Sequence, residues 1–510
     1  MPTSNAVAVH PLNAELLKAN PELSSWANDS LLPERVLQFG EGNFLRGFVD
    51  WMVDGMNRKG LFNGRVVVVQ PIAQGLVEKL NAQDGAYTLL MRGIEDGAVV
   101  EREELIASVS RGINPYTDWA GYLWCARNPE LRFIVSNTTE AGIAFNAEDR
   151  ITDKPPVSFP GKLTLFLLER YLAFGGDATK GCVVLPCELI ERNGDALKAA
   201  VLATAKRWAL EAEFVAWIES ANTFTNTLVD RIVTGYPKNE AEELEERLGY
   251  RDELLDSSEV FHLWVIEGPA WLAKELPLAE AGFNVIVTDN MKPYRDRKVG
   301  ILNGAHTGTV LAAYLAGFDY VGDLMKDAQI SGFMKRMIQE EVIPTLTLPK
   351  AELEQFAEAV YERFSNPFIR HAVLDISLNS ISKFKARVLP SLERSVAQRG
   401  VLPKRLTFAL AALIAFYRGT SVEDGALIGR RGEESYLIRD NVAILETMAG
   451  LWRTFDGSEG GSRALTDNVL GQVDWWGKDL REISGLAEET ARLVDAIVER
   501  GVRAAMTELD

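Results

Sequence analysis

Three side chains suited to proton transfer lie close together in one segment of the chain. The segment runs from Lys298 through Asn303 to His306. In a helix with about 100° per residue, Lys298, His306 and Asn303 fall at roughly 0°, 80° and 140°, and therefore on one side. Interconversion of an alcohol and a carbonyl needs a group that exchanges a proton with the substrate oxygen and donors that stabilise negative charge on it. This polar arc in an apolar stretch predicts such a site.

Lys298 is the candidate acid and base of this site. An isolated lysine has a pKa of about 10.4 and is a poor base at neutral pH. Burial, a helix N-terminus and the neighbouring cations Arg295 and Arg297 are each expected to lower that pKa. Asn303 is then a candidate donor to the developing alkoxide, and His306 a candidate for orienting the substrate. The alternative interpretation is a solvated lysine, a helix-bending asparagine and a packed histidine, which explains each residue alone better than the three together.

A glycine-rich loop follows the first expected strand and opens the first expected helix, residues 43–58. Such a loop lets the backbone approach a pyrophosphate that sits on the helix N-terminus. The spacing departs from G-x-G-x-x-G because Leu45 occupies the third glycine position, so a plain tight turn is the alternative interpretation. The candidate cofactor-binding residues of this loop are Gly40, Gly42, Asn43, Phe44 and Arg46.

Two further loops are expected at the carboxyl ends of parallel strands, where they would face the ligand crevice. The second strand ends at Gln70, where an acidic residue normally holds the adenosine ribose. Glutamine can still hydrogen-bond a ribose hydroxyl, and no arginine follows it to attract a 2′-phosphate, so we expect NAD(H) as the cofactor. After a later strand come Asn137, Thr138 and Glu140, which are further candidates for cofactor contacts. For this second loop a simple polar turn is an equally good interpretation.

Strand and helix patterns alternate over the first 290 or so residues. This alternation predicts an α/β fold with a Rossmann-type doubly wound sheet. From about residue 292 the apolar residues recur at helical spacing and strand candidates nearly vanish. We therefore predict a dinucleotide-binding domain over residues 1–290 and an all-helical, substrate-binding domain over residues 291–510. A cleft between two such domains is the expected ligand site.

Composition limits the kinds of partner that the chain can bind. Its 510 residues favour two domains, and its formal net charge of −18 disfavours binding to nucleic acid or to an anionic membrane. An anionic substrate would need a local cluster of Arg or Lys. With three cysteines in no zinc-binding pattern and only four histidines, no metal site is expected. The N-terminus resembles no signal peptide and no apolar run could span a membrane, which predicts a cytoplasmic protein.

The motifs together resemble the polyol-specific long-chain dehydrogenase/reductase family, which includes the mannitol dehydrogenases. Lys298, Asn303 and His306 match its K-x-x-x-x-N-x-x-H signature, and residues 40–46 are similar to its G-x-G-x-F-x-R motif. Residues 228–231 are similar to its Met-Val-Asp-Arg string. The resemblance covers about residues 35–395. It implies a Rossmann-type fold, NAD(H) as cofactor, hydride transfer without a metal, and Lys298 as the general acid in reduction and the general base in oxidation.

Within the family, residues 37–46, 137–143, 186–194 and 301–307 most resemble the branch that interconverts tagaturonate and altronate in hexuronate breakdown. The chain departs from the polyol enzymes at two places. Leu189 stands where those enzymes carry a second oxyanion asparagine, and Asp375 stands where they carry an arginine eight residues before the lysine matched by Lys383. These departures indicate an altered pocket and put the second oxyanion donor in doubt.

A sugar-acid carboxylate requires cations, and arginine suits bidentate carboxylate binding. The candidate residues for the substrate are Arg370, His371, Lys383, Arg387 and Asp230. For the first four, a solvated basic helix face is the alternative interpretation. Asp230 is interpreted either as orienting Lys298 or as an ion-pair partner of the next residue.

Three rival functions remain at this point. Fructuronate reductase and a mannitol-type polyol 2-dehydrogenase share the chemistry and differ in substrate. A non-catalytic nucleotide-binding protein belongs to a different class, but such a protein has no physical need to keep Lys298, Asn303 and His306 together. We expect a small-molecule sugar acid as ligand and a monomer or small homo-oligomer.

Overall fold

The computed structural model describes residues 10–20 and 31–509, except for the side chain of Glu140. The chain forms two compact units. The first comprises Met1–Gly93 and Val99–Met291, and the second comprises Ile94–Ala98 and Lys292–Asp510. We propose residues 1–290 and 291–510 as the two domains, because this division falls beside that boundary.

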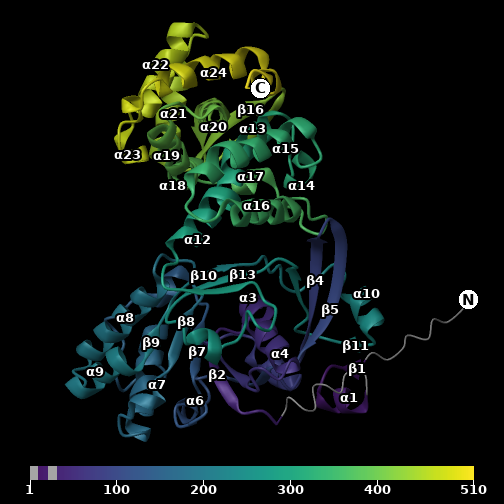
Figure 1. The fold of residues 1–510 in the computed structure, drawn as a ribbon, viewed down its shortest axis with the longest axis vertical. Helices are drawn as coiled ribbons and strands as arrows, with labels where there is room; N and C mark the ends of the chain where they lie inside the picture. Colours follow the sequence, from purple (N-terminus) through teal and green to yellow (C-terminus); the bar gives the residue numbers. More distant parts are fainter. Residues whose placement is uncertain (1–9, 21–30, 510) are drawn as a thin grey trace, which may run out of the picture. The chain divides into compact units, whose positions relative to one another are not determined.

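A six-stranded parallel sheet forms the centre of the first unit (Figure 1). Its strands lie in the order β6-β3-β2-β7-β8-β9, and every neighbouring pair is parallel. Counted along the chain within this sheet, the order is third, second, first, fourth, fifth and sixth, which is the Rossmann order with its switch point between β2 and β7. The predicted doubly wound sheet is confirmed. The strands are β2 (Glu34–Phe39), β3 (Arg65–Val69), β6 (Val109–Ile113), β7 (Phe133–Ser136), β8 (Val183–Pro186) and β9 (Thr223–Phe224).

Both faces of this sheet are buried. Successive residues of a strand point to opposite sides of the sheet, so the burial of neighbouring residues reports on both faces. Val66 and Val68 belong to one hydrophobic cluster, and Val67 and Val69 belong to the other. Every residue of β3 is buried. A parallel sheet covered on both faces needs apolar residues at consecutive positions, and this need explains the uninterrupted β-branched runs that the sequence shows.

One continuous helix follows β2 and carries the glycine-rich loop at its start. It consists of α3 (Asn43–Leu45), a π-helical segment η2 (Arg46–Asp50) and α4 (Trp51–Arg58). Its extent agrees with the predicted helix over residues 43–58. The chain therefore leaves β2, turns at the glycines and enters a helix whose N-terminus lies at the carboxyl end of the sheet.

The remaining elements of the first unit surround this sheet. Its other helices are α1 (Ala14–Ala19), α5 (Val77–Ala82), α6 (Trp119–Cys125), η3 (Glu140–Ile143), α7 (Phe159–Ala173), η4 (Ala178–Lys180), α8 (Asn193–Arg207), α9 (Ala212–Ala221), α10 (Ala241–Leu248) and α11 (Leu272–Glu275). Two three-stranded sheets have the orders β12-β4-β5 and β10-β13-β14, and β1 (His10–Pro11) pairs with β11 (Tyr250–Arg251). Their strands are β4 (Tyr87–Glu95), β5 (Ala98–Ile106), β10 (Asn226–Asp230), β12 (Asp256–Glu259), β13 (Leu263–Glu267) and β14 (Val285–Thr288).

The second unit is mostly helical. Its first helix is continuous over α12 (Lys292–Arg297), the π-helical η5 (Lys298–Asn303) and α13 (Gly304–Leu315). The helices that follow are α14 (Val321–Leu324), α15 (Ala328–Arg336), η6 (Met337–Val342), η7 (Ile343–Thr345), α16 (Lys350–Phe364), α17 (Val373–Ile376), α18 (Ser380–Arg387), α19 (Leu389–Arg399), α20 (Lys404–Phe416), α21 (Val442–Thr454), α22 (Glu459–Leu470), α23 (Val473–Trp476), η8 (Leu480–Glu482), α24 (Leu486–Arg500) and α25 (Val502–Thr507).

The prediction that this unit is all-helical was wrong. A three-stranded antiparallel sheet interrupts the helices, with β15 (Gly419–Glu423), β16 (Ala426–Arg431) and β17 (Glu434–Ile438). The turn between β15 and β16 is Asp424-Gly425, and both residues have positive φ, 48° and 75°. Asp-Gly in a two-residue turn is a strong hairpin signal. The signal was present in the sequence, but the surrounding helical patterns obscured it.

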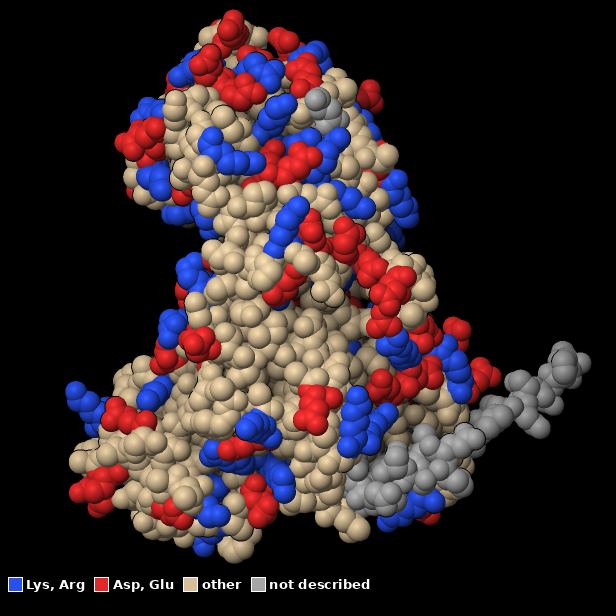
Figure 2. All heavy atoms as spheres, viewed as in Figure 1, with Lys and Arg blue, Asp and Glu red and all other residues tan. Residues whose placement is uncertain are grey.

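The surface of the chain carries charges of both signs. On the face drawn in Figure 2, Lys and Arg are interspersed with Asp and Glu, and the described residues show no extended basic patch there. No helix among the described residues is long and apolar enough to cross a membrane. Cations for an anionic ligand must therefore be sought in small local groups.

Arg231 ties the end of β10 to the helix that follows the glycine-rich loop. Its guanidinium donates to Gly47 O at 2.6 Å and to Glu259 O at 3.0 and 2.9 Å, and it lies 4.0 Å from the centre of the Trp51 ring. Burial lowers its pKa to about 10, so the side chain stays charged at neutral pH. Hydrogen bonds from a buried charged group to buried carbonyls are costly to lose.

Arg231→Ala is expected to lower the free energy of unfolding of the first unit by about 2–4 kcal/mol, because two buried carbonyl groups lose their donor. Arg127→Ala is the matched control, since Arg127 is an exposed partner of Glu169 and such pairs contribute at most about 1 kcal/mol. Urea denaturation followed by far-ultraviolet circular dichroism measures both. Equal losses in the two variants would contradict this role.

Candidate active site

The glycine-rich loop leaves open space in front of a helix N-terminus. Gly40 has a φ of +126°, and a Cβ there would lie 3.2 Å from Leu45 Cδ1 and 3.3 Å from Asn137 O. Gly42 is the N-cap of α3, receives no side-chain cap hydrogen bond, and has no atom within 4 Å of the place that a Cβ would occupy. Unsatisfied N–H groups and the helix dipole favour an anion at such a position. This cradle fits the pyrophosphate of a dinucleotide.

Arg46 fixes the conformation of this loop through hydrogen bonds. Its buried guanidinium donates to Glu41 O at 3.2 Å and to Asn43 Oδ1 at 2.7 Å, and it also donates to Leu254 O. The Tyr87 ring centre lies 5.2 Å away. Because Arg46 is 2% exposed, its position indicates that it shapes the loop rather than offering its charge to the surface.

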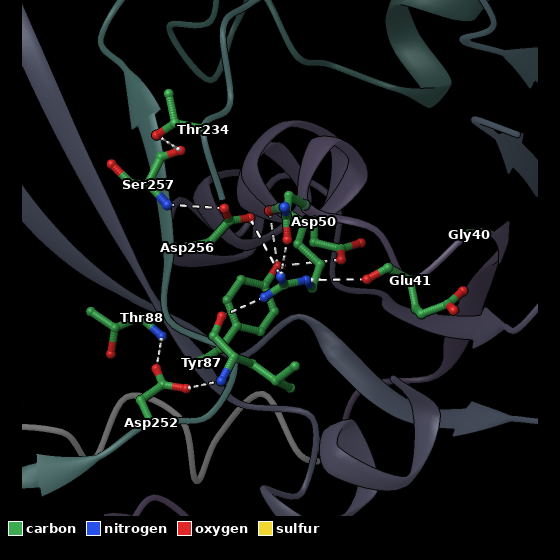
Figure 3. Close-up of polar contacts among 12 residues, drawn as sticks. Gly40, Glu41, Asp50, Tyr87, Thr88, Thr234, Asp252, Asp256 and Ser257 are labelled. Atoms are coloured by element: carbon green, nitrogen blue, oxygen red, sulfur yellow. Dashed lines mark hydrogen bonds and ion pairs between the residues drawn. The ribbon is translucent and has the colours of Figure 1, made fainter. Parts of the chain in front are cut away.

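Two buried carboxyl groups complete the network under the loop, Asp50 and Asp256 (Figure 3). Burial raises the pKa of each to about 7, and the charge of Arg46, 3.9 Å from Asp256, opposes that rise. Tyr87 donates to Asp50 at 3.3 Å and to Arg46 O at 2.9 Å. The network connects the loop and η2 with β4 and β12.

Asn43 and Phe44, the two remaining predicted residues of the loop, differ in their exposure. Asn43 is exposed. Phe44 is half-buried and stacks on Phe48 at 4.9 Å. We therefore retain Asn43 as a candidate for direct cofactor contact and assign Phe44 to packing.

A second loop lies beside the first at the switch point of the sheet. The Asn137 amide donates to Cys187 O at 2.8 Å. Thr138 donates to the buried Glu188 carboxylate through its backbone N–H at 2.9 Å and its hydroxyl at 3.0 Å. Sequence analysis missed Glu188, which fixes this loop. The Glu140 side chain lies outside the described part of the structure.

The segment after β8 contains Leu189, the position at which the polyol enzymes carry the second oxyanion asparagine. This side chain offers no hydrogen-bond donor. Leu189 is 69% exposed and is apolar. Asn193, a few residues later, is fully buried and donates to Pro186 O at 2.9 Å and to Glu188 O at 3.1 Å. Its amide is therefore engaged in holding this turn.

Gln70 does not present its amide to a ribose as predicted. The side chain is 2% exposed. Its Nε2 donates to Ile72 O at 2.9 Å and to Ala73 O at 3.0 Å, and its Oε1 accepts a long hydrogen bond of 3.4 Å from Val77 N. The amide is satisfied by its own loop, because residues 71–76 form bends whose carbonyls need donors.

In the second unit, the helix that carries Lys298 is π-helical over Lys298–Asn303. The prediction of regular α-helical spacing at this point was wrong. In a π-helix the hydrogen bonds join residues five apart, so Lys298 and Asn303 lie about one turn apart and closer to one face than an α-helix would place them. Both side chains are half-buried. Single π-helical turns within α-helices are frequent at functional sites.

His306 lies three residues beyond this segment against two aromatic rings. It stacks on Phe364 at 3.8 Å with an interplanar angle of 9°, and it meets the ring of His371 edge-on at 5.5 Å. Its Nε2 is buried with no hydrogen-bond partner among the described residues. Burial lowers the pKa of His306 well below its usual value, and the neighbouring charges act in the same direction. The ring is therefore neutral at neutral pH.

Cations gather around His306. Lys383, Arg387 and Arg363 each lower its pKa through their charge. Lys383 donates to Ile376 O at 2.8 Å. Arg387 is half-buried, burial lowers its pKa, and within the described residues it has neither an ion pair nor a side-chain hydrogen bond. Sequence analysis missed Arg363, because its position in the amphipathic α16 resembles an ordinary surface charge.

The two remaining predicted substrate residues belong to different units. Arg370 is exposed, and its guanidinium lies 4.1 Å from the centre of the Tyr320 ring, so it does not share the surroundings of His306. Asp230 is buried at the end of β10 in the first unit. Of the predicted basic group, the structure brings together His371, Lys383 and Arg387.

The sequence matches models of two domains of known proteins. Residues 34–280 match the mannitol dehydrogenase Rossmann domain, and residues 290–498 match the mannitol dehydrogenase C-terminal domain. The chain belongs to the mannitol dehydrogenase family. Within this family it is 50% identical to an altronate oxidoreductase of Cronobacter sakazakii over 481 residues, covering 94% of this chain and 98% of that protein. An altronate oxidoreductase of Escherichia coli is 49% identical over 478 residues, covering 94% and 97%.

Two solved structures share the fold of this chain. Mannitol 2-dehydrogenase of Pseudomonas fluorescens, in a ternary complex with NAD and D-mannitol, superposes with a TM-score of 0.67 at 22% identity and covers 98% of this chain and 99% of that one. A substrate-free D-sorbitol dehydrogenase superposes with a TM-score of 0.76 at 23% identity and covers 97% and 100%. At these identities the likeness establishes the fold.

His306 makes the stability of the second unit sensitive to acid. Its folded-state pKa is lowered, so below about pH 6.5 the unfolded chain binds a proton that the folded chain does not. The stability that neutral His306 contributes is therefore present above pH 6.5 and is lost as the pH falls. His306→Gln is expected to remove this dependence, so that between pH 6.5 and 5 its free energy of unfolding falls by about 1 kcal/mol per pH unit less than that of the wild type.

Urea denaturation at several pH values measures the two slopes. His10→Gln is the control, because His10 is exposed, and it is expected to keep the wild-type slope. Parallel slopes for His306→Gln and the wild type would show that burial of this ring does not govern the response.

Proposed function

We propose that the chain is an NAD-dependent oxidoreductase that interconverts altronate and tagaturonate. The observation that carries this proposal is the near-full-length similarity, at about half identity, to proteins named altronate oxidoreductase. The open helix N-terminus at Gly42 supports dinucleotide binding. The set of Lys298, Asn303 and His306 on one helix supports a catalytic protein over a nucleotide-binding one.

The reaction converts altronate and NAD⁺ into tagaturonate, NADH and a proton. Bound NAD(H) supplies the hydride acceptor or donor. Neutral Lys298 accepts the hydroxyl proton in oxidation, and charged Lys298 donates a proton to the keto oxygen in reduction. Asn303 donates a hydrogen bond to that oxygen and stabilises its negative charge. Neutral His306 orients the substrate through Nε2, which has no partner among the described residues.

The charge of the substrate explains the cations around His306. A sugar acid carries a carboxylate, and a chain with a net charge of −18 repels it at long range. The half-buried Arg387, which no described carboxylate neutralises, offers two parallel N–H donors to such a group. Lys383 and His371 adjoin it. We propose these three residues as the carboxylate-binding group, with Arg363 as a further cation beside Arg387 and Lys383. A cytoplasmic location, activity without a metal, and a monomer or small homo-oligomer remain part of the proposal.

Following NADH absorbance with tagaturonate, fructuronate and fructose offered separately tests the function. Rapid oxidation of NADH with tagaturonate alone is expected. Turnover with fructuronate or fructose in its place would move the protein to a sister activity. Lys298→Ala tests the role of Lys298. This variant is expected to lose turnover while its affinity for NADH stays within about twofold of the wild type. Equal loss of turnover and NADH binding would contradict the role of Lys298.

Arg387→Met is expected to raise the KM for tagaturonate by roughly 10–100-fold, because a hydrogen-bonded charge pair contributes about 1.5–3 kcal/mol. Arg370→Met provides a matched change at the arginine that lies over Tyr320, and its KM is expected to stay within about threefold. Steady-state kinetics at saturating NADH compare the two. A larger effect at Arg370 would place the carboxylate elsewhere.

A further inference from the structure

The cofactor site lacks a carboxylate at the place where a dinucleotide-binding fold normally has one. NAD-binding sheets usually carry an acid at the end of the second strand, where it bonds the adenosine ribose and repels a 2′-phosphate. Here that position is Gln70, and its amide donates to Ile72 O and Ala73 O of the following loop. Gln70 therefore provides neither the usual charge nor a free amide, and selection between NAD and NADP must come from another group.

The Glu41 carboxylate lies at this place, although it comes from the glycine-rich loop. A Cβ built on Gly75 would overlap Glu41 Oε1 and would lie 2.6 Å from Gln70 Oε1, so both side chains meet under the backbone of Gly75. Gly75 is exposed. The Glu41 side chain is buried; burial raises the pKa of its carboxyl group, and the N–H groups of Glu41 and Leu76 and the charge of Arg46 oppose that rise. Glu41 thus reaches from the loop after β2 to the end of β3.

The Glu41 carboxylate forms no ion pair within the network that shapes the loop, although the charge of Arg46 acts on its pKa. Its backbone carbonyl accepts from Arg46, but its side chain points away from Asp50, Tyr87 and Asp256 (Figure 3). The loop 71–76 contains neither lysine nor arginine. Lys162 donates to Val157 O at 2.8 Å and lies 5.2 Å from the centre of the Tyr116 ring, whose hydroxyl bonds Pro71 O at 3.5 Å. Its charge is thus engaged on the far side of Tyr116.

We propose that Glu41 selects NAD(H) over NADP(H), supplying from the glycine-rich loop the carboxylate that is absent from the end of β3. The adenosine ribose of the dinucleotide binds over Gly75 and Glu41, next to the pyrophosphate at Gly42. A 2′-phosphate at this position would meet the Glu41 charge at close range, and no described cation of the loop 71–76 would offset it. This inference rests on the proposed function, since it assumes a bound dinucleotide.

The test measures the dissociation constants of NADH and NADPH for the full chain by fluorescence titration, in the wild type, Glu41→Gln and Glu78→Gln. Glu41→Gln keeps the size of the side chain and removes its charge. Glu78→Gln removes the same charge from an exposed position on α5, close in sequence to the same loop. The wild type and Glu78→Gln are expected to prefer NADH. Glu41→Gln is expected to lower that preference about tenfold or more, mainly through tighter binding of NADPH.

Other outcomes overturn the proposal in distinguishable ways. An unchanged NADH-to-NADPH ratio, or equal weakening of both cofactors, would show that Glu41 only braces the loop. Equal relaxation in Glu78→Gln would indicate a general effect of net charge. Failure of the wild type to bind either dinucleotide would overturn this inference and the proposed function together. Glu41→Asp retains the charge, and it is expected to keep the preference for NADH even if shortening the side chain weakens binding overall.

Discussion

The ligand-binding end of the first unit depends on one buried guanidinium. Arg46 bonds the carbonyl of Glu41, the side chain of Asn43 and the carbonyl of Leu254. These contacts fix the loop between β2 and its helix, and they hold Gly42 at a helix N-terminus that no side chain caps. Burying such a charge is expensive unless hydrogen bonds and nearby carboxylates compensate for it. Asp50, Asp256 and Tyr87 provide that surrounding, so the polar network beneath the loop supports the open helix N-terminus at the surface.

The sequence predicted the features that follow from local periodicity. The alternation of apolar strand patterns with helical patterns predicted the doubly wound sheet, because both faces of that sheet must be buried. Apolar residues at helical spacing predicted most of the second unit. The sheet β15–β17 was missed, since its strands are short and its Asp424-Gly425 turn stands between strong helical patterns. The π-helix at Lys298–Asn303 was also missed. A register change of this kind depends on how the helix packs against the rest of its unit, and it leaves no repeat in the sequence.

Side-chain orientation limited the prediction of the site in the same way. Gln70 occupies the predicted position, yet its amide turns into its own loop. Arg370 and His371 are adjacent in sequence, but only His371 packs against His306, and Arg370 lies over Tyr320. Arg363 and Glu188 contribute charge or hydrogen bonds from segments with no motif of their own. Residue type and spacing therefore identify which groups can react, whereas tertiary packing decides which of them meet.

The two units use cations in opposite ways, and the proposed ligands account for the difference. In the first unit the charge of Arg46 is taken up by carbonyls and carboxylates, so the proposed pyrophosphate would be met by backbone N–H groups and a helix dipole. In the second unit Arg387 is half-buried with no ion pair among the described residues. Leaving such a charge unpaired costs stability, and in a chain with 72 acidic residues a partner would be easy to supply. The proposed anionic substrate would be attracted to this unpaired charge, and that attraction must also overcome the net negative charge of the chain.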